Sequence, residues 1–159
     1  MIKYTTYQIT FAEVPDEASL TFSISNCPGR CEGCHSPELR EDVGEDLIKD
    51  LPLLIEKYRG MITCVALLGE GNDLLALQEV IDIIHKNGLK SCVYYGRDEY
   101  SEILPFSDYI KLGHYDCKRG GLNNPNTNQK FYRTYYDESG VVCFESLTHK
   151  FWKKKEELL

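Results

Sequence analysis

The chain has 159 residues, of which 42% are hydrophobic and 27% are charged, and its formal net charge is −7. This composition is typical of one soluble globular domain. The negative charge argues against nucleic acid as a direct partner. No window approaches the roughly 20 apolar residues of a spanning helix, so we expect no membrane association. The first residues show no signal peptide, so we expect a cytoplasmic protein whose thiols stay reduced.

Strands are predicted where apolar residues alternate with polar ones or form short continuous runs. In chain order they cover residues 3–11, 18–25, 61–68, 90–96 and 107–113. The run at 61–68 does not alternate, which is typical of a strand buried on both faces of a parallel sheet. A hairpin is predicted over 130–144, with its turn at 137–140.

Helices are predicted between these strands. The first covers 44–60, with an interruption or restart at Pro52. The second follows Asp73 and ends at Gly88, because apolar residues recur there at helical spacing. Two short helices are expected at 98–106 and 146–158, and a long polar loop at 114–129.

The alternation of strands and helices predicts right-handed crossovers and a mostly parallel sheet. We therefore expect a single α/β domain over residues 1–159, folded as a partial (β/α) barrel. Polar or glycine-rich segments follow four of the strands, and they begin at Asn26, Gly69, Gly96 and Gly113. Because active sites of parallel α/β folds lie at the carboxyl ends of strands, these segments should meet at one rim.

Three cysteines, Cys27, Cys31 and Cys34, fall within eight positions and are followed by His35. Buried structural thiols fit Cys64 and Cys92, which lie inside apolar strands. That interpretation does not fit the three clustered cysteines, because they lie in a loop of Pro, Gly, Arg and Glu. A metal or a catalytic role is more typical of such thiols in a reducing compartment.

Three kinds of metal site come into question. Structural zinc needs a fourth ligand, for which His35 is adjacent and Cys117 or Cys143 are distant candidates. Covalent haem fits the C-x-x-C-H pattern at 31–35, but that attachment is normally made outside the cytoplasm and leaves Cys27 unused. An iron–sulfur cluster on three thiolates leaves one iron without a protein ligand, and an open position lets a metal bind substrate.

The spacing C-x3-C-x2-C at 27–34 resembles the signature of radical S-adenosylmethionine (radical SAM) enzymes. The segment NCPGRCEGCHSPEL at 26–39 is similar to that of anaerobic ribonucleoside-triphosphate reductase activating proteins. In that family a Gly precedes the last cysteine, and a His or Asn and a Pro follow. The segment NNPNTNQKFY at 123–132 is similar to an Asn-Gln segment near the end of the same family, and the short chain also fits it.

The resemblance implies that Cys27, Cys31 and Cys34 ligate a [4Fe–4S] cluster, with Gly33 as a cofactor-binding residue beside them. The amino and carboxylate groups of SAM would then chelate the open iron.

The resemblance also implies contacts with SAM itself. Gly69 and Glu70 stand where the family has a Gly-Gly-Glu segment that contacts the amino group, although Leu68 replaces its first glycine. Lys111 is the candidate for the SAM carboxylate and for the catalytic residue, and Gly96 is the candidate for the ribose.

The implied activity is reductive cleavage of SAM to a 5′-deoxyadenosyl radical. That radical would take hydrogen from a glycine of anaerobic ribonucleoside-triphosphate reductase. The implied electron donor is a low-potential protein such as flavodoxin. The chain has no G-x-x-x-x-G-K phosphate loop, which favours nucleotide chemistry on a partner protein. The alternatives are another small radical SAM enzyme acting on a different peptide, and a non-catalytic zinc or iron–sulfur binding module.

Overall fold

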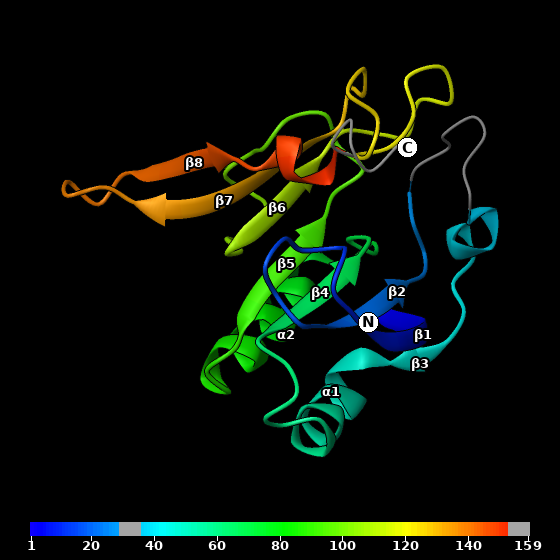
Figure 1. Cartoon of the computed structure of the whole chain (residues 1–159). Coiled ribbons are helices and arrows are strands. Elements are labelled where there is room, and N and C mark those ends of the chain that lie inside the picture. Colours follow the sequence, from blue (N-terminus) through cyan, green and yellow to red (C-terminus); the bar gives the residue numbers. More distant parts are fainter. Residues whose placement is uncertain (29–35, 153–159) are drawn as a thin grey trace.

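The computed structural model describes residues 1–28 and 36–152. These residues form one eight-stranded sheet of order β3-β1-β2-β4-β5-β6-β7-β8 (Figure 1). The strands are β1 (Lys3–Thr10), β2 (Ser19–Ile24), β3 (Glu45–Asp46), β4 (Cys64–Leu68), β5 (Lys90–Tyr94), β6 (Tyr109–Leu112), β7 (Lys130–Tyr136) and β8 (Val142–Ser146). The α-helices are α1 (Leu47–Lys57) and α2 (Leu74–Lys86), and 3-10 turns cover Pro37–Arg40 and Thr148–Phe151. Within these ranges no helix is long and apolar enough to cross a membrane.

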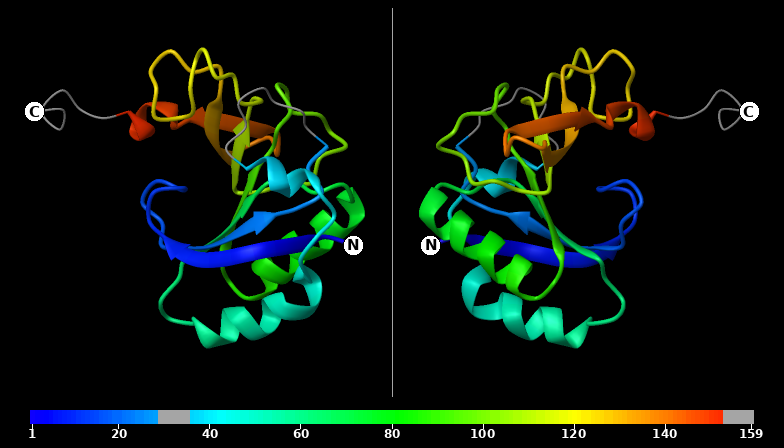
Figure 2. Two further views of the ribbon diagram at one scale, coloured as in Figure 1. Left: turned by 90° about the vertical axis from the view of Figure 1, so that its right-hand side faces the viewer. Right: turned by 90° about the vertical axis from the view of Figure 1, so that its left-hand side faces the viewer.

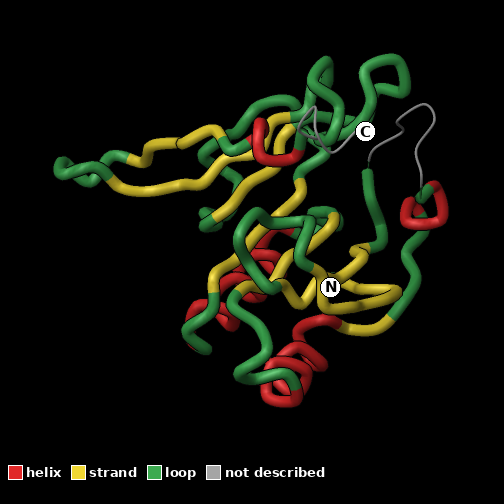
Figure 3. The backbone as a smooth tube through the Cα atoms, viewed as in Figure 1, coloured by secondary structure: helices red, strands yellow, loops and turns green. Residues whose placement is uncertain are grey.

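The sheet is mixed. Strands β2, β4, β5 and β6 pair in parallel. The pairs β1–β2, β1–β3, β6–β7 and β7–β8 are antiparallel, so antiparallel pairs outnumber parallel ones by four to three. The prediction of a mostly parallel sheet in a partial (β/α) barrel is therefore wrong. Only two crossovers carry an α-helix in the described chain, and loops connect β5 to β6 and β6 to β7 (Figure 3).

Two local predictions also fail, and proline is involved in both. Residues 98–106 form turns instead of a helix. Pro105 near the end of this short segment disfavours helical geometry in the residue before it. Helix α1 instead runs without interruption through Pro52. Burial of Leu47, Leu51 and Ile55 on one side of α1 offsets the hydrogen bond that the proline cannot donate.

Both α-helices cover the same face of the sheet (Figure 2). Side chains alternate along β4, so Val65 and Leu67 pack in the core beneath the helices, whereas Cys64 and Ala66 pack on the opposite face. The prediction that this strand is buried on both faces is confirmed. The second face has its own core, which includes Val14 from the loop between β1 and β2.

Candidate functional site

A cavity of about 280 Å³ lies at the carboxyl ends of β2, β4, β5 and β6. The predicted site residues within the described chain all line it, and they are Cys27, Gly69, Glu70, Gly96 and Lys111. The parallel pairing of these four strands brings their carboxyl ends to one edge. The rim expected from chain order is therefore present, even though the sheet around it is mixed.

The cysteine segment enters this rim through an anchored backbone. Asn26 has a positive φ of 57° and its N–H donates to the Glu41 carbonyl at 2.9 Å. The N–H of Cys27 donates to the Leu39 carbonyl, also at 2.9 Å. These two bonds anchor the backbone that leads into Cys27 beside the cavity.

The other predicted ligands, Cys31 and Cys34, lie outside the described residues, as do Gly33 and His35. Among the residues that are described, no three His, Cys, Asp or Glu side chains form a group that could hold a metal ion. Cys117 and Cys143, the distant zinc candidates, are not among the described residues that line the cavity.

Lys111 is 8% exposed, on the face of β6 opposite the helices. Its Nζ donates hydrogen bonds to the carbonyls of Tyr95 at 3.0 Å and Gly113 at 2.9 Å. The ammonium also lies 5.6 Å from the centre of the Tyr94 ring, within the range of a cation–π contact. The two carbonyls and the ring orient the Lys111 ammonium at the wall of the cavity.

Glu70 is 4% exposed and follows β4. Its Oε2 accepts a hydrogen bond from Nε of Arg97 at 2.9 Å. Glu70 does not cap α2, because the N-cap is Asp73, whose carboxylate accepts a hydrogen bond from the Ala76 N–H. Sequence reasoning missed Arg97, although a charged residue directly after Gly96 at a strand end was an available signal.

His114 lines the cavity, and sequence reasoning did not assign it to the site. Its Nδ1 lies 2.7 Å from Oδ1 of Asp98, and its backbone N–H donates to the same oxygen. These hydrogen bonds hold the pKa of Asp98 below its ordinary value. The contact orients the imidazole ring and ties the loop after β5 to the loop after β6.

Two glycines give the cavity its backbone shape. At Gly96 an added Cβ would meet no atom of the described residues within 4 Å, so the open side of this residue leaves room for a ligand. Gly113 has a φ of +107°, and a Cβ there would lie 2.9 Å from Cα of Gln129. The end of β6 and the start of β7 therefore approach each other more closely than any side chain on residue 113 allows.

The two thiols interpreted as structural behave as expected. Cys64 and Cys92 are fully buried. Burial raises the pKa of Cys64 to about 12 and raises that of Cys92 well above its ordinary value. Neutral buried thiols are poor nucleophiles and poor metal ligands, so they do not compete with Cys27 for a site role.

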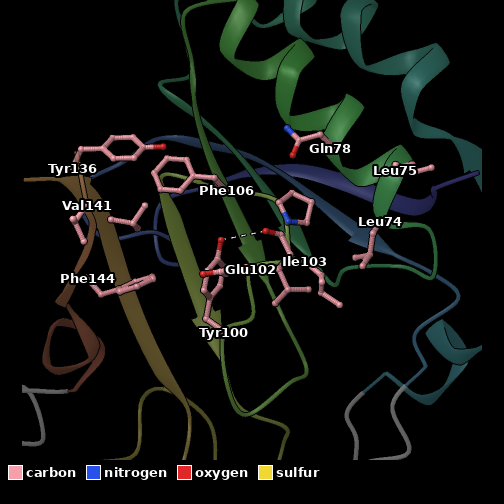
Figure 4. A pocket seen from close by; sticks show the side chains of 13 residues that line it. Leu74, Leu75, Gln78, Tyr100, Glu102, Ile103, Phe106, Tyr136, Val141 and Phe144 are labelled. Carbon is pink, nitrogen blue, oxygen red and sulfur yellow. Dashed lines mark hydrogen bonds between the residues drawn. The ribbon is translucent and has the colours of Figure 1, made fainter. Parts of the chain in front are cut away.

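A larger cavity of about 700 Å³ lies between the start of α2 and the β7–β8 hairpin (Figure 4). Its walls are mostly apolar, with Leu74 and Leu75 on the helix side and Tyr136, Val141 and Phe144 on the hairpin side. Its lining offers no thiol or imidazole among the described residues. The smaller cavity is therefore the candidate site for chemistry.

Comparison of the chain with models of protein families, with curated proteins and with solved structures finds no match.

Proposed function

We propose that the chain is a radical SAM activase for anaerobic ribonucleoside-triphosphate reductase. One electron from a low-potential donor such as flavodoxin enters SAM, and the S–C5′ bond breaks to give methionine and a 5′-deoxyadenosyl radical. A hydrogen atom then moves from a glycine Cα of the reductase to C5′. The products are methionine, 5′-deoxyadenosine and a glycyl radical on the reductase.

One observation carries the proposal. Four segments that are far apart in the sequence bring Cys27, Glu70, Gly96 and Lys111 to the same cavity. These are the residues that the resemblance assigns to the cluster and to three different parts of SAM. The eight-stranded mixed sheet is not itself an argument for this function, because a fold does not specify an activity.

The donor set suits a cluster. Cys27 is at the cavity, and Cys31 and Cys34 follow within the same eight positions of sequence. Three thiolates would hold a [4Fe–4S] cluster with one iron open to the amino and carboxylate groups of SAM. When bound, the cluster would supply the low-potential electron.

The remaining lining suits the methionine part of SAM. The Lys111 ammonium is complementary to its carboxylate, and the Glu70 carboxylate to its ammonium group. Both side chains are buried, so each interaction gains from the low local dielectric. The cavity volume of about 280 Å³ is slightly below the usual range for small-molecule sites, which begins at about 300 Å³. The open side of Gly96 leaves space beside it for the ribose.

The test uses protein that is reconstituted with iron and sulfide under anaerobic conditions. With SAM and a reductant it should release 5′-deoxyadenosine and methionine in equal amounts. Addition of the reductase from the same source should give a doublet in the electron paramagnetic resonance spectrum, and replacement of the reductase glycine should remove it.

Each other result identifies an alternative. SAM cleavage without a radical on the reductase points to a different peptide substrate. Purified protein that contains zinc, or a cluster without SAM cleavage, points to a non-catalytic binding module.

A further inference from the structure

Arg97 holds Glu70 from outside the candidate cavity. The Nε–Oε2 distance is 2.9 Å, and the exposed fractions of the side chains are 5% for Glu70 and 40% for Arg97. Glu70 lines both the candidate cavity and a neighbouring cavity of about 430 Å³, whereas Arg97 lines only the neighbouring one. The guanidinium therefore reaches the candidate cavity only through the carboxylate that it binds.

The backbone of Arg97 also makes a hydrogen bond, which links the loop after β5 to the end of β6. Its carbonyl accepts a hydrogen bond from the Gly113 N–H at 2.6 Å. Arg97 thus connects the loop after β5 to the end of β6 with its main chain, and to the loop after β4 with its side chain. A substitution of the side chain removes the second connection and leaves the first.

The Glu70 carboxylate keeps acceptor capacity on its other oxygen. Arg97 binds Oε2, and the side-chain hydrogen bonds found among the described residues leave Oε1 to other donors. An ionised carboxylate accepts several hydrogen bonds, and a buried one is strongly favoured to bind a cation.

We propose that Arg97 is a positioning residue: by holding Oε2 it orients Glu70 so that Oε1 accepts hydrogen bonds from the ammonium group of SAM. The inference rests on the proposed function and adds a residue that the resemblance does not supply. Arg97 touches neither SAM nor the reacting atoms, so its effect is on SAM binding and not on bond cleavage.

The test compares Arg97→Gln with Arg97→Lys and with Arg133→Gln in reconstituted protein. Arg133 is a matched control, because its Nε donates to Oε2 of Glu145 at 3.0 Å on the hairpin, outside the cavity lining. Calorimetry gives the SAM affinity, steady-state cleavage gives KM and kcat, and a thermal scan gives the unfolding midpoint.

Arg97→Gln should weaken SAM binding and raise KM by about tenfold, with little change in kcat. Arg97→Lys keeps the charge but not the planar donor, so it should recover part of the affinity. Arg133→Gln should bind SAM like the wild type. If Arg97→Gln lowers the unfolding midpoint, the comparison rests on Arg97→Lys, for which a SAM affinity as low as that of Arg97→Gln overturns the proposal.

A double-mutant cycle separates action through Glu70 from an independent effect. Combining Arg97→Gln with Glu70→Gln should weaken SAM binding no more than Glu70→Gln alone. Additive losses, or a lower kcat at unchanged KM, overturn the positioning role and leave the proposed function intact. Wild-type protein that binds no SAM instead rejects the proposed function and this inference with it.

Discussion

The hydroxyl of Tyr94 donates a hydrogen bond to the backbone carbonyl of Glu13, which is 81 residues away in the sequence. Tyr94 lines the candidate cavity, and its ring lies under the Lys111 ammonium. The loop between β1 and β2 is thereby tied to the wall of the cavity. This loop closes the second face of the sheet toward the amino ends of the strands, where Val14 is fully buried.

Replacement of Tyr94 by Phe should lower the free energy of unfolding by about 1 kcal/mol, because one buried hydrogen bond is lost. SAM affinity should change little, since the ring beside Lys111 is kept. Urea unfolding and calorimetry measure the two effects. Tyr136→Phe, at a tyrosine that is 58% exposed, is the control and should be neutral. A large loss of SAM affinity in Tyr94→Phe would assign the hydroxyl itself a role in binding.

Alanine variants of the clustered cysteines should lose iron, whereas a variant of a buried cysteine should keep it. Reconstituted wild-type protein should hold about four iron atoms. Cys27→Ala, Cys31→Ala and Cys34→Ala should each lose the iron and the visible absorbance. Cys64→Ala should keep the iron and lose roughly 1–2 kcal/mol of stability through a small core cavity. Full iron in Cys31→Ala contradicts the ligand assignment.

Lys111→Ala should weaken SAM binding by roughly 1–3 kcal/mol, because a buried charge-assisted contact is lost. It also leaves the carbonyls of Tyr95 and Gly113 without this donor, so the thermal midpoint is recorded in parallel. Lys118→Ala, at an exposed lysine of the neighbouring loop, is the control. Unchanged SAM affinity in Lys111→Ala, with lower stability, assigns the lysine a structural role only.

The stability of the metal-free protein should fall above about pH 9. Burial raises the pKa of Cys64 from an ordinary value of 9.0 to about 12, so the unfolded chain loses this proton at lower pH than the folded one. The contribution of the protonated Cys64 thiol to the free energy of unfolding is fully present below pH 9. It falls as the pH rises toward 12, by at most about 1.4 kcal/mol per pH unit. Urea unfolding across this range measures the slope, and Cys64→Ala should reduce it. An identical slope in the variant assigns the loss to other groups.

Gly113→Ala should destabilise the protein more than Gly140→Ala. Both glycines have a positive φ, +107° and +79°, so both substitutions carry the cost of a left-handed backbone, about 1 kcal/mol. Only at Gly113 does the added Cβ also meet backbone, at 2.9 Å from Cα of Gln129. Urea unfolding gives the difference between the variants. Equal losses mean that the chain relaxes around residue 113 without cost.

Local sequence patterns determined where most elements lie. The predicted strands at 61–68 and 90–96 correspond to β4 and β5, the helical spacing after Asp73 to α2, and the turn at 137–140 to the β7–β8 hairpin. Periodicity and turn chemistry act between near neighbours, so they are readable from the chain alone. The order of the segments was also enough to place Cys27, Glu70 and Lys111 on one rim.

Only the tertiary structure decided the directions of the outer strands and the partners of the charged side chains. Strands β1 and β7 run antiparallel to their neighbours β2 and β6. This direction depends on long-range pairing and on the path of the loops, which local sequence patterns do not determine. Continuation of α1 through Pro52 depends on the burial of one helix face against the sheet. The pairing of Arg97 with Glu70, 27 positions apart, follows from the approach of two strand ends that parallel pairing brings together.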